Sequence, residues 1–451
     1  MHVLIYLLMI KQTAFAIVLI ITLTVFAITV RKLVKLFKLT KPAFPVRDIG
    51  RRIIITLKVA FLQTKILRKP VVGMMHALVW WGFLVILAGS LEMVIDGLAG
   101  TERVLKFLGV VYDIIIASGD IFALLIAVLI CAFLVRRLFM NIRRFTGVEM
   151  KHKFHVDATI ALSLILFLMI TLLGMNTFYI LYAESEGSVI AGTYPVSSYF
   201  SGIFEGTSAG SSHLWHEVNW WGHILGIFFF ANYLPYSKHF HVFMSVPNVF
   251  LSNLAPVGKM TLMENVTKEV RIMMNPEAEY SETGEEGEAV PERFGILDIE
   301  DITWKNYLDS LACTQCGRCT SVCPANLTGK LLSPRKIVMN VRERMSVKGN
   351  GMIKNGSDWN DGKALLGDYI TAEELWACTT CNACVQECPI NINQPAVILD
   401  MRRYIVMEQS AAPGELNQIF SNLENNGAPW QFSQEDRMMW AEDLYINKPA
   451  G

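Results

Sequence analysis

Two short cysteine runs constrain this chain more than any other feature. Both have the spacing C-x2-C-x2-C-x3-C-P, and they begin at Cys313 and Cys378. This spacing wraps three thiolates round one face of a [4Fe–4S] cubane, and the proline turns the chain so that the fourth cysteine ligates the other cluster. The expected ligands are Cys313, Cys316, Cys319 and Cys388 for the first cluster, and Cys378, Cys381, Cys384 and Cys323 for the second.

Zinc sites and disulfides are the alternatives for groups of four cysteines. Two identical runs that both end in proline favour iron–sulfur clusters. The runs use eight of the nine cysteines, and Cys131, in an apolar segment, is expected to be a small buried hydrophobe. Thiolate ligands predict a reducing compartment for this part of the chain.

The composition predicts a membrane protein with more than one domain. The chain has 451 residues, 53% of them hydrophobic, and a mean hydropathy of +0.38. The net charge of zero gives no reason to expect a nucleic-acid partner. Five stretches reach the roughly 20 apolar residues that a bilayer requires. They are residues 3–30, 71–95, 111–135, 156–181 and 215–235.

The distribution of charge predicts the orientation. Residues 31–70 carry twelve Lys and Arg against one acid, and residues 136–153 carry six against Glu149, whereas residues 183–214 have no Lys or Arg. The positive-inside rule then puts both basic segments in the cytoplasm and the N-terminus outside. Five crossings place the cysteine runs in the cytoplasm. Segment 31–70 also has apolar residues throughout, which favours amphipathic helices on anionic lipid over a poorly ordered loop.

Three histidines lie in or beside these apolar stretches, where an imidazole needs a partner. His76 is near the cytoplasmic end of the second stretch, and His223 and His241 are 18 residues apart. Five helical turns put the last two on one face, about 27 Å apart along the axis. That separation suits two haem planes across one bilayer, and neutral imidazole is a usual axial ligand for electron-carrying haem b.

Residues 223–226, 235–241 and 245–247 resemble the last transmembrane helix of the haem b γ-subunit of respiratory nitrate reductase, and also the membrane subunit of methanogen heterodisulfide reductase. His76, followed by Trp80-Trp81-Gly82-Phe83, is similar to the inner-side ligand of the second helix in that family. The resemblance implies that His76 and His241 hold a cytoplasmic-side haem b.

The sequence departs from that pattern ten residues after His76, where Ile86 replaces the second histidine. His223 therefore lacks a partner for an outer haem, since His216 lies two turns away on the same helix. The sequence therefore allows either one haem or two. If there is no outer haem, the alternative role of His223 is a hydrogen bond to a quinone. His239 is the alternative inner ligand.

Two acids, Glu92 and Asp96, lie at the outer end of the second stretch. They are either acceptors of quinol protons or plain helix-end acids at the water boundary.

The cytoplasmic half begins with a linker, residues 251–293, which is acidic from 276 onward. Residues 294–411 are predicted to form an all-helical ferredoxin-like domain with two [4Fe–4S] clusters, including a helix opened by Ser333 and a capping box at Thr371. The expected fold is therefore mainly α: a five-helix transmembrane haem b bundle in residues 1–250, followed by this domain.

Residues 302–319 resemble the iron–sulfur subunits of heterodisulfide-reductase-type proteins, whose relatives include fused electron-transfer-flavoprotein:quinone oxidoreductases. Residues 412–451 are similar to the bridge that leads, in those relatives, into cysteine-rich CCG domains. With its other cysteines already assigned, the chain is expected to use residues 412–451 to bind a separate CCG-domain subunit or an electron-transfer flavoprotein.

These features predict a quinone-linked electron-transfer subunit of a respiratory oxidoreductase in the bacterial inner membrane. Electrons would pass between menaquinone or another quinone, haem b, the two clusters and the cytoplasmic partner, in either direction. A redox-sensing or assembly protein, and a haem-less relay from cluster to quinone, are the alternatives.

Overall fold

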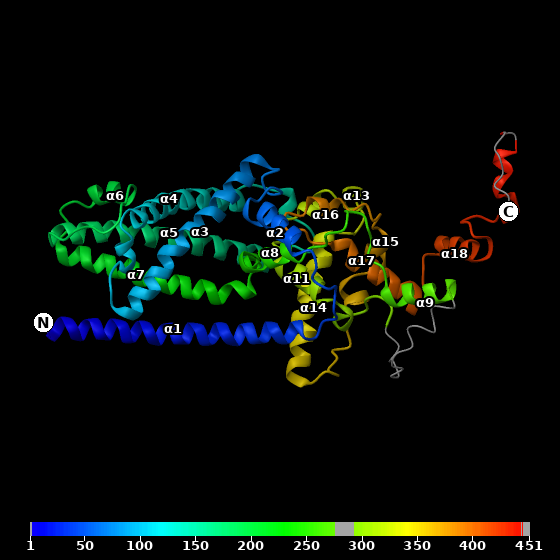
Figure 1. Cartoon of the computed structure of the whole chain (residues 1–451), viewed down its shortest axis with the longest axis horizontal. Helices are drawn as coiled ribbons and strands as arrows, with labels where there is room; N and C mark the ends of the chain where they lie inside the picture. Colours follow the sequence, from blue (N-terminus) through cyan, green and yellow to red (C-terminus); the bar gives the residue numbers. More distant parts are fainter. Residues whose placement is uncertain (1, 276–292, 443, 445–451) are drawn as a thin grey trace. The chain divides into compact units, whose positions relative to one another are not determined.

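The structure is a computed structural model that describes residues 2–275, 293–442 and 444. These residues are mainly helical, as predicted (Figure 1). In this part of the chain β-pairing is limited to isolated bridges, Lys41 with Thr303 and Leu366 with Ile370. The acidic stretch 276–292 and the tail residues 443 and 445–451 lie outside the described residues.

Four helices among the described residues are long and apolar enough to cross a membrane. They are α1 (His2–Phe37, apolar from Met9), α3 (Pro70–Ala99), α4 (Val110–Leu138) and α5 (His152–Ser185). The fifth expected span forms α7 (Ala209–Tyr233). This helix is not among the four, and its first half carries the polar residues His213, His216, Glu217 and Asn219.

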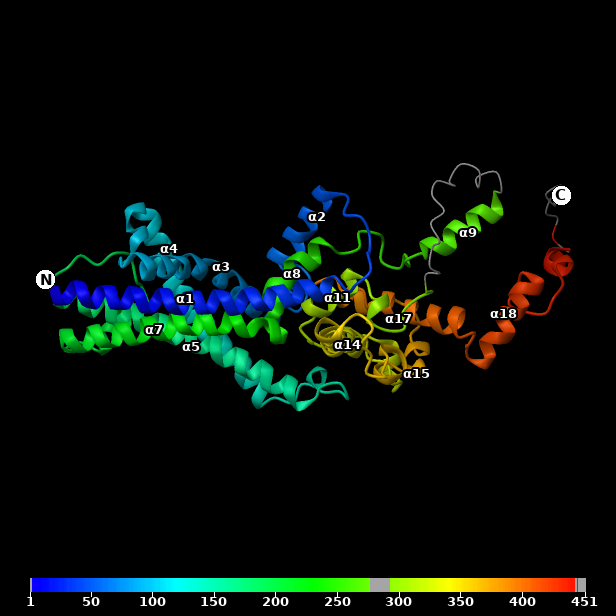
Figure 2. The same cartoon turned by 90° about the horizontal axis from the view of Figure 1, so that it is seen from below.

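These five helices pack together lengthwise, as Figures 1 and 2 show. Helix α5 packs along α7 and against α4, while α1 contacts α3 and α7. Phe15, Met93, Met175 and Ile224 meet in one buried cluster, which joins α1, α3, α5 and α7. The helices therefore share an apolar core, although only four of them have the composition of a typical membrane span.

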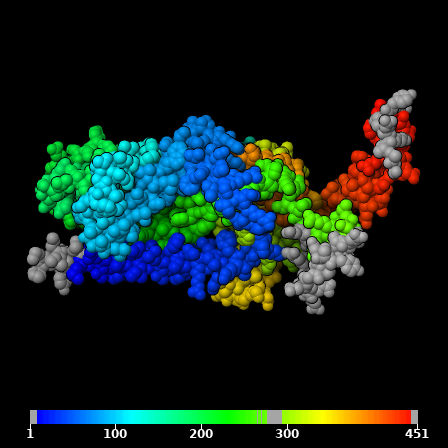
Figure 3. All heavy atoms as spheres, in the orientation of Figure 1, coloured from blue at the N-terminus to red at the C-terminus, as the bar shows by residue number. Residues whose placement is uncertain are grey.

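The outer face of α1 is apolar and exposed, as a surface in contact with lipid would be. Ile20 and Ile28 are more than half exposed, and Figure 3 shows α1, in dark blue, along one face of the molecule. Thr22 and Thr24 donate their hydroxyl protons to the carbonyl oxygens four residues earlier, at 2.8 and 2.7 Å. These polar groups are therefore satisfied within the helix, as hydrocarbon surroundings require.

The basic segment after α1 is folded. It contains α2 (Ile49–Thr56), which continues as a π-helical turn (Leu57–Phe61) and packs against α8 (His241–Phe250). Arg52 is buried and donates to the carbonyl oxygens of Phe250 and Ser252, at 2.8 and 3.0 Å. This arginine thus joins two parts of the sequence almost 200 residues apart.

The residues around the cysteine runs form short helices and one long one. These are α11 (Trp304–Ala312), α12 (Arg318–Ser321), α13 (Pro324–Leu327), α14 (Pro334–Asn355), α15 (Ala372–Trp376), α16 (Ala383–Glu387) and α17 (Gln394–Arg403). The predicted caps are confirmed: the Ser333 side chain accepts from the Lys336 N–H, and Thr371 and Glu374 form a capping box. The helix that Ser333 opens, α14, is 22 residues long.

The chain divides into two compact units. The first comprises Met1–Thr261 with Asp298–Ala396, so the apolar helices and both cysteine runs belong to one unit. The second comprises the described parts of Leu262–Leu297 and Val397–Gly451, which include α9 (Glu264–Met274) and α18 (Gly414–Asn426).

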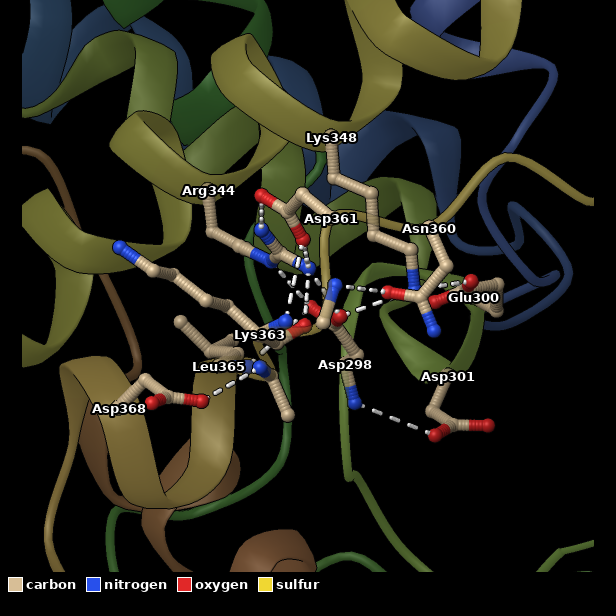
Figure 4. Close-up of polar contacts among 12 residues, drawn as sticks. Asp298, Glu300, Asp301, Arg344, Lys348, Asn360, Asp361, Lys363, Leu365 and Asp368 are labelled. Carbon is tan, nitrogen blue, oxygen red and sulfur yellow. Dashed lines mark hydrogen bonds and ion pairs between the residues drawn. The ribbon is translucent and has the colours of Figure 1, made fainter.

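A buried ion network fixes the start of the cluster-bearing residues to α14 (Figure 4). The fully buried Arg344 guanidinium donates to both carboxylate oxygens of Asp298, at 2.8 and 2.7 Å, and to both of Asp361, at 2.8 and 2.9 Å. Lys348 also donates to Asp298, at 2.9 Å. The hydrogen bonds from Arg344 lower the pKa of Asp361 to about 2, so this pair stays charged at neutral pH.

Replacing Arg344 should destabilise this region, because it would leave two carboxylates without their main partner. We expect Arg344→Met to cost about 3–5 kcal/mol, the usual cost of breaking a buried ion pair. The loss of cluster absorbance during a guanidinium titration of the full-length protein in detergent measures this effect. Lys354→Met, at an exposed position of the same helix, should leave the midpoint unchanged; equal midpoints for the two variants would contradict the prediction.

Candidate electron-transfer site

The two cysteine runs have the same local backbone. Gln315 and Gly317 in the first run, and Thr380 and Asn382 at the equivalent positions of the second, all have positive φ angles between 55° and 73°. These left-handed residues turn the chain between successive cysteines. Gly317 is required for a further reason: a Cβ there would lie 2.4 Å from the Arg144 carbonyl oxygen.

All nine cysteines are free thiols. Cys319, Cys323, Cys384 and Cys388 are buried, whereas Cys381 is exposed. Cys131 is exposed on α4, which corrects the expectation that it is buried. It lies on the outward face of an apolar helix, so an apolar environment there would come from lipid and not from the protein core.

The first thiol group combines residues from both runs. Burial raises the pKa of the Cys388 thiol to about 12, and the neighbouring Cys316 and Cys313 raise it further. Burial likewise raises the pKa of Cys319, which interacts with Cys316, Cys313 and Cys388. The fourth cysteine of the second run therefore lies beside the first three cysteines of the first run.

The second thiol group has the reciprocal composition. Burial raises the pKa of Cys323, and nearby Cys378 and Cys381 add to this. The pKa of Cys384 is raised to about 12 by burial, with contributions from Cys378, Cys323 and Cys381. Thiols in such surroundings become ligands only when a metal cation offsets the charge of the thiolates.

This donor set fits two iron–sulfur clusters, because each group offers four free thiols, the number that one [4Fe–4S] cluster requires. Two backbone N–H groups also point to sulfur: Ile392 N–H donates to Cys388 Sγ and Thr380 N–H to Cys378 Sγ, both at 3.4 Å. Within the described ranges, no three His, Cys, Asp or Glu side chains are arranged around a single metal-ion position.

The loops between the apolar helices contact the first thiol group. Lys65 donates to the Cys388 carbonyl oxygen at 3.2 Å, and Arg318 donates to the carbonyl oxygens of Lys65 and Ile66 at 3.1 and 3.3 Å. The fully buried Arg335 pairs with Glu149 at 2.7 Å. Buried apolar residues of α2, α8, α11 and α14 complete this interface, with Cys313 and Cys388 packed among them.

His76 and His241 face each other with their ring centroids 6.4 Å apart. Two imidazoles on one metal ion, each with its nitrogen about 2.0–2.1 Å away, have ring centres about 6 Å apart once the size of the rings is included. His76 Nδ1 lies 3.1 Å from Gln63 Oε1, and His241 Nδ1 lies 3.2 Å from the Lys238 carbonyl oxygen. With both Nδ1–H groups donating, both Nε2 atoms remain available as ligands.

The pair therefore fits a haem iron held through two imidazole nitrogens. His239, the alternative inner ligand, has its ring centroid 5.6 Å from that of His241, on the same stretch of chain. The imidazole ring that faces His76 is that of His241.

A cavity of about 100 Å³ lies between α3, α4, α5 and α7, toward the C-terminal end of α3, away from His76. His216 and His223 both line it, as does Ile86. His223 Nδ1 donates to the Leu168 carbonyl oxygen at 2.9 Å, and His216 Nδ1 donates to that of Met175 at 3.0 Å. The structure thus puts His223, His216 and Ile86 on one cavity.

The acids at this cavity are buried and hydrogen-bonded. Glu92 accepts from Leu105 N–H at 2.9 Å and from the Tyr112 hydroxyl at 3.1 Å. Asp96 accepts from Thr101 Oγ1 at 2.6 Å and from two backbone N–H groups. Both acids therefore hold the loop after α3 in place, a role closer to that of structural helix-end groups than of free proton acceptors.

The sequence analysis missed two charged residues of this cavity, Asp120 and Arg103. Asp120 is 1% exposed and accepts from Val196 N–H, Ser197 N–H and Ser197 Oγ. Arg103 stacks on Tyr179 and donates to Asn176 at 3.2 Å. A lone acid inside an apolar stretch is the signal that could have revealed Asp120.

The cysteine runs and the long apolar helices define the class: an iron–sulfur protein with helices long enough to span a membrane. Residues 312–392 match the family model of the 4Fe-4S dicluster domain. No solved structure matches the chain.

Two curated relatives align over most of the chain. The chain is 27% identical over 413 residues to the probable iron-sulfur-binding oxidoreductase FadF of Bacillus subtilis, which is 85% of this chain and 54% of FadF. It is also 27% identical over 409 residues to the EtfAB:quinone oxidoreductase of Syntrophomonas wolfei, which is 86% of this chain and 54% of that protein. The chain therefore spans about half the length of these relatives.

A third relative matches a shorter region. The probable membrane-anchored ferredoxin of Chromohalobacter salexigens is 38% identical over 165 residues, which is 33% of this chain and 24% of that protein. The predicted similarity to iron–sulfur oxidoreductases is thus confirmed by relatives of that description.

Each run is expected to supply one ligand to the cluster of the other run, and this predicts a specific effect of Cys388→Ser. Although Cys388 is in the second run, its loss should disrupt the cluster of Cys313, Cys316 and Cys319, and the iron content should fall from about eight atoms per chain towards four. Iron analysis and the electron paramagnetic resonance (EPR) spectrum of anaerobically purified protein measure this. Cys131→Ser is the control and should retain both signals. If Cys388→Ser instead loses the EPR signal that Cys381→Ser loses, the assignment of Cys388 to the first cluster is refuted.

Proposed function

We propose that the protein is the quinone-reactive electron-transfer subunit of a respiratory oxidoreductase. The two thiol groups would each hold a [4Fe–4S] cluster, and His76 and His241 would hold one haem b. When bound, these groups supply one-electron carriers. The residues of this chain bind them, exclude water from them and set their potentials.

The observation that carries the proposal is the facing pair His76 and His241, in the same compact unit as the cysteine runs. Their separation suits axial ligation of one metal ion. The pair lies where the apolar helices meet the cluster-bearing residues, since α8 begins at His241 and packs against both α2 and α11. The proposed carriers would therefore extend from the helices into the cluster domain.

The cavity lined by His216 and His223 is the proposed quinone site. A quinol headgroup donates two hydroxyl protons and needs hydrogen-bond acceptors in its pocket. His223 is 1% exposed, and its Nδ1–H already donates to the Leu168 carbonyl oxygen, so its Nε2 atom is such an acceptor. Ile86, at the position where the resemblance would require a second histidine, also lines the cavity. We therefore favour a quinone over a second haem at this position.

The proposed location is the bacterial inner membrane, with the N-terminus outside and the clusters in the cytoplasm. The four apolar helices and the basic residues of segments 31–70 and 136–153 support it. The proposed partner is a CCG-domain iron–sulfur subunit or an electron-transfer flavoprotein. One relative is described as an EtfAB:quinone oxidoreductase and is almost twice as long as the aligned region, which is consistent with a partner in that role.

Replacing His76 tests the haem directly. His76→Ala should remove a low-spin b-type haem signal from purified membranes and leave the iron–sulfur EPR signals in place, because the cysteine groups do not depend on this ring. His239→Ala is the matched control and should retain the haem. An unchanged haem spectrum in His76→Ala would reject the pairing. Absence of reducible b-type bands from the wild-type protein would leave only the haem-less relay.

Replacing His223 tests the quinone site. His223→Leu should slow the reduction of the haem by a menaquinol analogue about tenfold, because loss of one hydrogen bond worth about 1.4 kcal/mol corresponds to that factor. Reduction by dithionite should be unaffected. His213→Leu, an exposed position on the same helix, is the control. Loss of a second haem signal in His223→Leu would show instead that this residue is a haem ligand.

A further inference from the structure

Two arginines of the cluster-bearing residues reach the segments that carry the two facing histidines. Arg318 lies between Cys316 and Cys319, and it donates to the carbonyl oxygens of Lys65 and Ile66. These residues follow Gln63, whose side chain accepts from His76 Nδ1. Arg318 therefore connects the first cysteine run with the segment that orients His76.

Arg342 makes the corresponding contact on the other side. From α14, its Nη2 donates to the carbonyl oxygens of Pro235 and Ser237, at 3.3 and 3.0 Å. The next residue, Lys238, accepts from His241 Nδ1 through its own carbonyl oxygen. Arg342 therefore fixes the turn that orients His241.

Arg342 is also close to the first thiol group. Val338, one turn before Arg342 on α14, packs in the same apolar cluster as Cys313 and Cys388, and the charge of Arg342 interacts with Cys313, as does that of Arg335. Lys238 lies near the same thiol. Cys313 and Cys388 pack against Val246 and Val249 of α8, the helix that begins at His241. The first thiol group is thus placed against the histidine pair, with the Arg342 cation beside it.

The anions near these cations must be counted as well. Arg335 is paired with Glu149, Arg318 lies 3.9 Å from Glu387, and Asp157 interacts with both Lys238 and Arg342. The hydrogen bonds that Arg342 donates to Pro235 and Ser237 end on neutral carbonyl oxygens, so its charge is only partly offset there. An added electron on either neighbouring site is therefore stabilised by this guanidinium.

We infer that the cluster held by Cys313, Cys316, Cys319 and Cys388 is the one that exchanges electrons directly with the His76–His241 site, and that Arg318 and Arg342 position the two sites against each other. The inference rests on the proposed function. Arg342 acts as a positioning residue whose charge raises the reduction potential of both sites. The cluster that includes the exposed Cys381 is then the one that faces the partner.

The test uses the full-length protein in detergent. EPR-monitored titration gives the midpoint potentials of the two clusters, and optical titration gives that of the haem. In Arg342→Gln, the potentials of one cluster and of the haem should both shift to more negative values, while the second cluster stays unchanged. Arg342→Lys keeps the charge, so the potentials of this cluster and of the haem should stay close to those of the wild type. The second cluster is identified by Cys381→Ser, which replaces its exposed ligand.

Lys153→Gln is the matched control, because Lys153 is exposed and pairs with Glu343, the neighbour of Arg342, at 3.1 Å. Solvent screens its charge, so no potential should change. If Arg342→Gln does not assemble, Arg318→Gln is titrated in its place and should shift the same cluster. Unchanged potentials, equal shifts of both clusters, or a shift of the Cys381 cluster alone would overturn the inference. A wild-type protein without haem would overturn the proposed function itself.

Discussion

A buried thiolate is stable only beside positive charge, and this constraint governs the cysteine groups of this chain. Burial raises the pKa of five of the eight thiols, those of Cys313, Cys319, Cys323, Cys384 and Cys388. The pKa of Cys388 reaches about 12 without a metal, and that of Cys384 does the same. The arrangement of the surrounding chain follows from that cost. Lys65, Arg335 and Arg342 approach the first group. Lys65 donates to the Cys388 carbonyl oxygen, whereas Arg335 and Arg342 donate to the carbonyl oxygens of Arg144 and Pro235, just beyond the ends of α4 and α7.

Much of this could be predicted from the sequence, because some residue types have strong local consequences. The cysteine spacing predicts the two ligand groups, and the Thr371–Glu374 capping box and the helix after Ser333 were predicted correctly. The four apolar spans were predicted from hydropathy, whereas α7 carries too many polar residues in its first half to be counted with them. Hydropathy along the sequence is therefore a poor guide to a helix such as α7, which is polar and packs against other helices of the protein.

The contacts that join the parts could not be predicted in this way. Arg318 and Lys65 are about 250 residues apart in sequence, and Arg342 and Ser237 about 100. Each arginine on its own resembles a solvated surface charge. Cys131 shows the opposite error, since an apolar neighbourhood in sequence did not mean burial within the protein. Only the folded structure shows which charges are paired and which apolar faces remain outside.

The shared unit has a consequence for dissecting this protein. Three residues of the N-terminal part bond to residues in or beside the cysteine runs. Lys65 and Asn248 donate to the carbonyl oxygens of Cys388 and Ile390, and Glu149 accepts from the Ser333 hydroxyl. A fragment of residues 294–411 expressed alone would expose Cys388 and leave the Arg335 guanidinium without its carboxylate. The ferredoxin part is therefore not a detachable module, and any natural separation of the two halves into different polypeptides would have to preserve this contact as an obligate subunit interface.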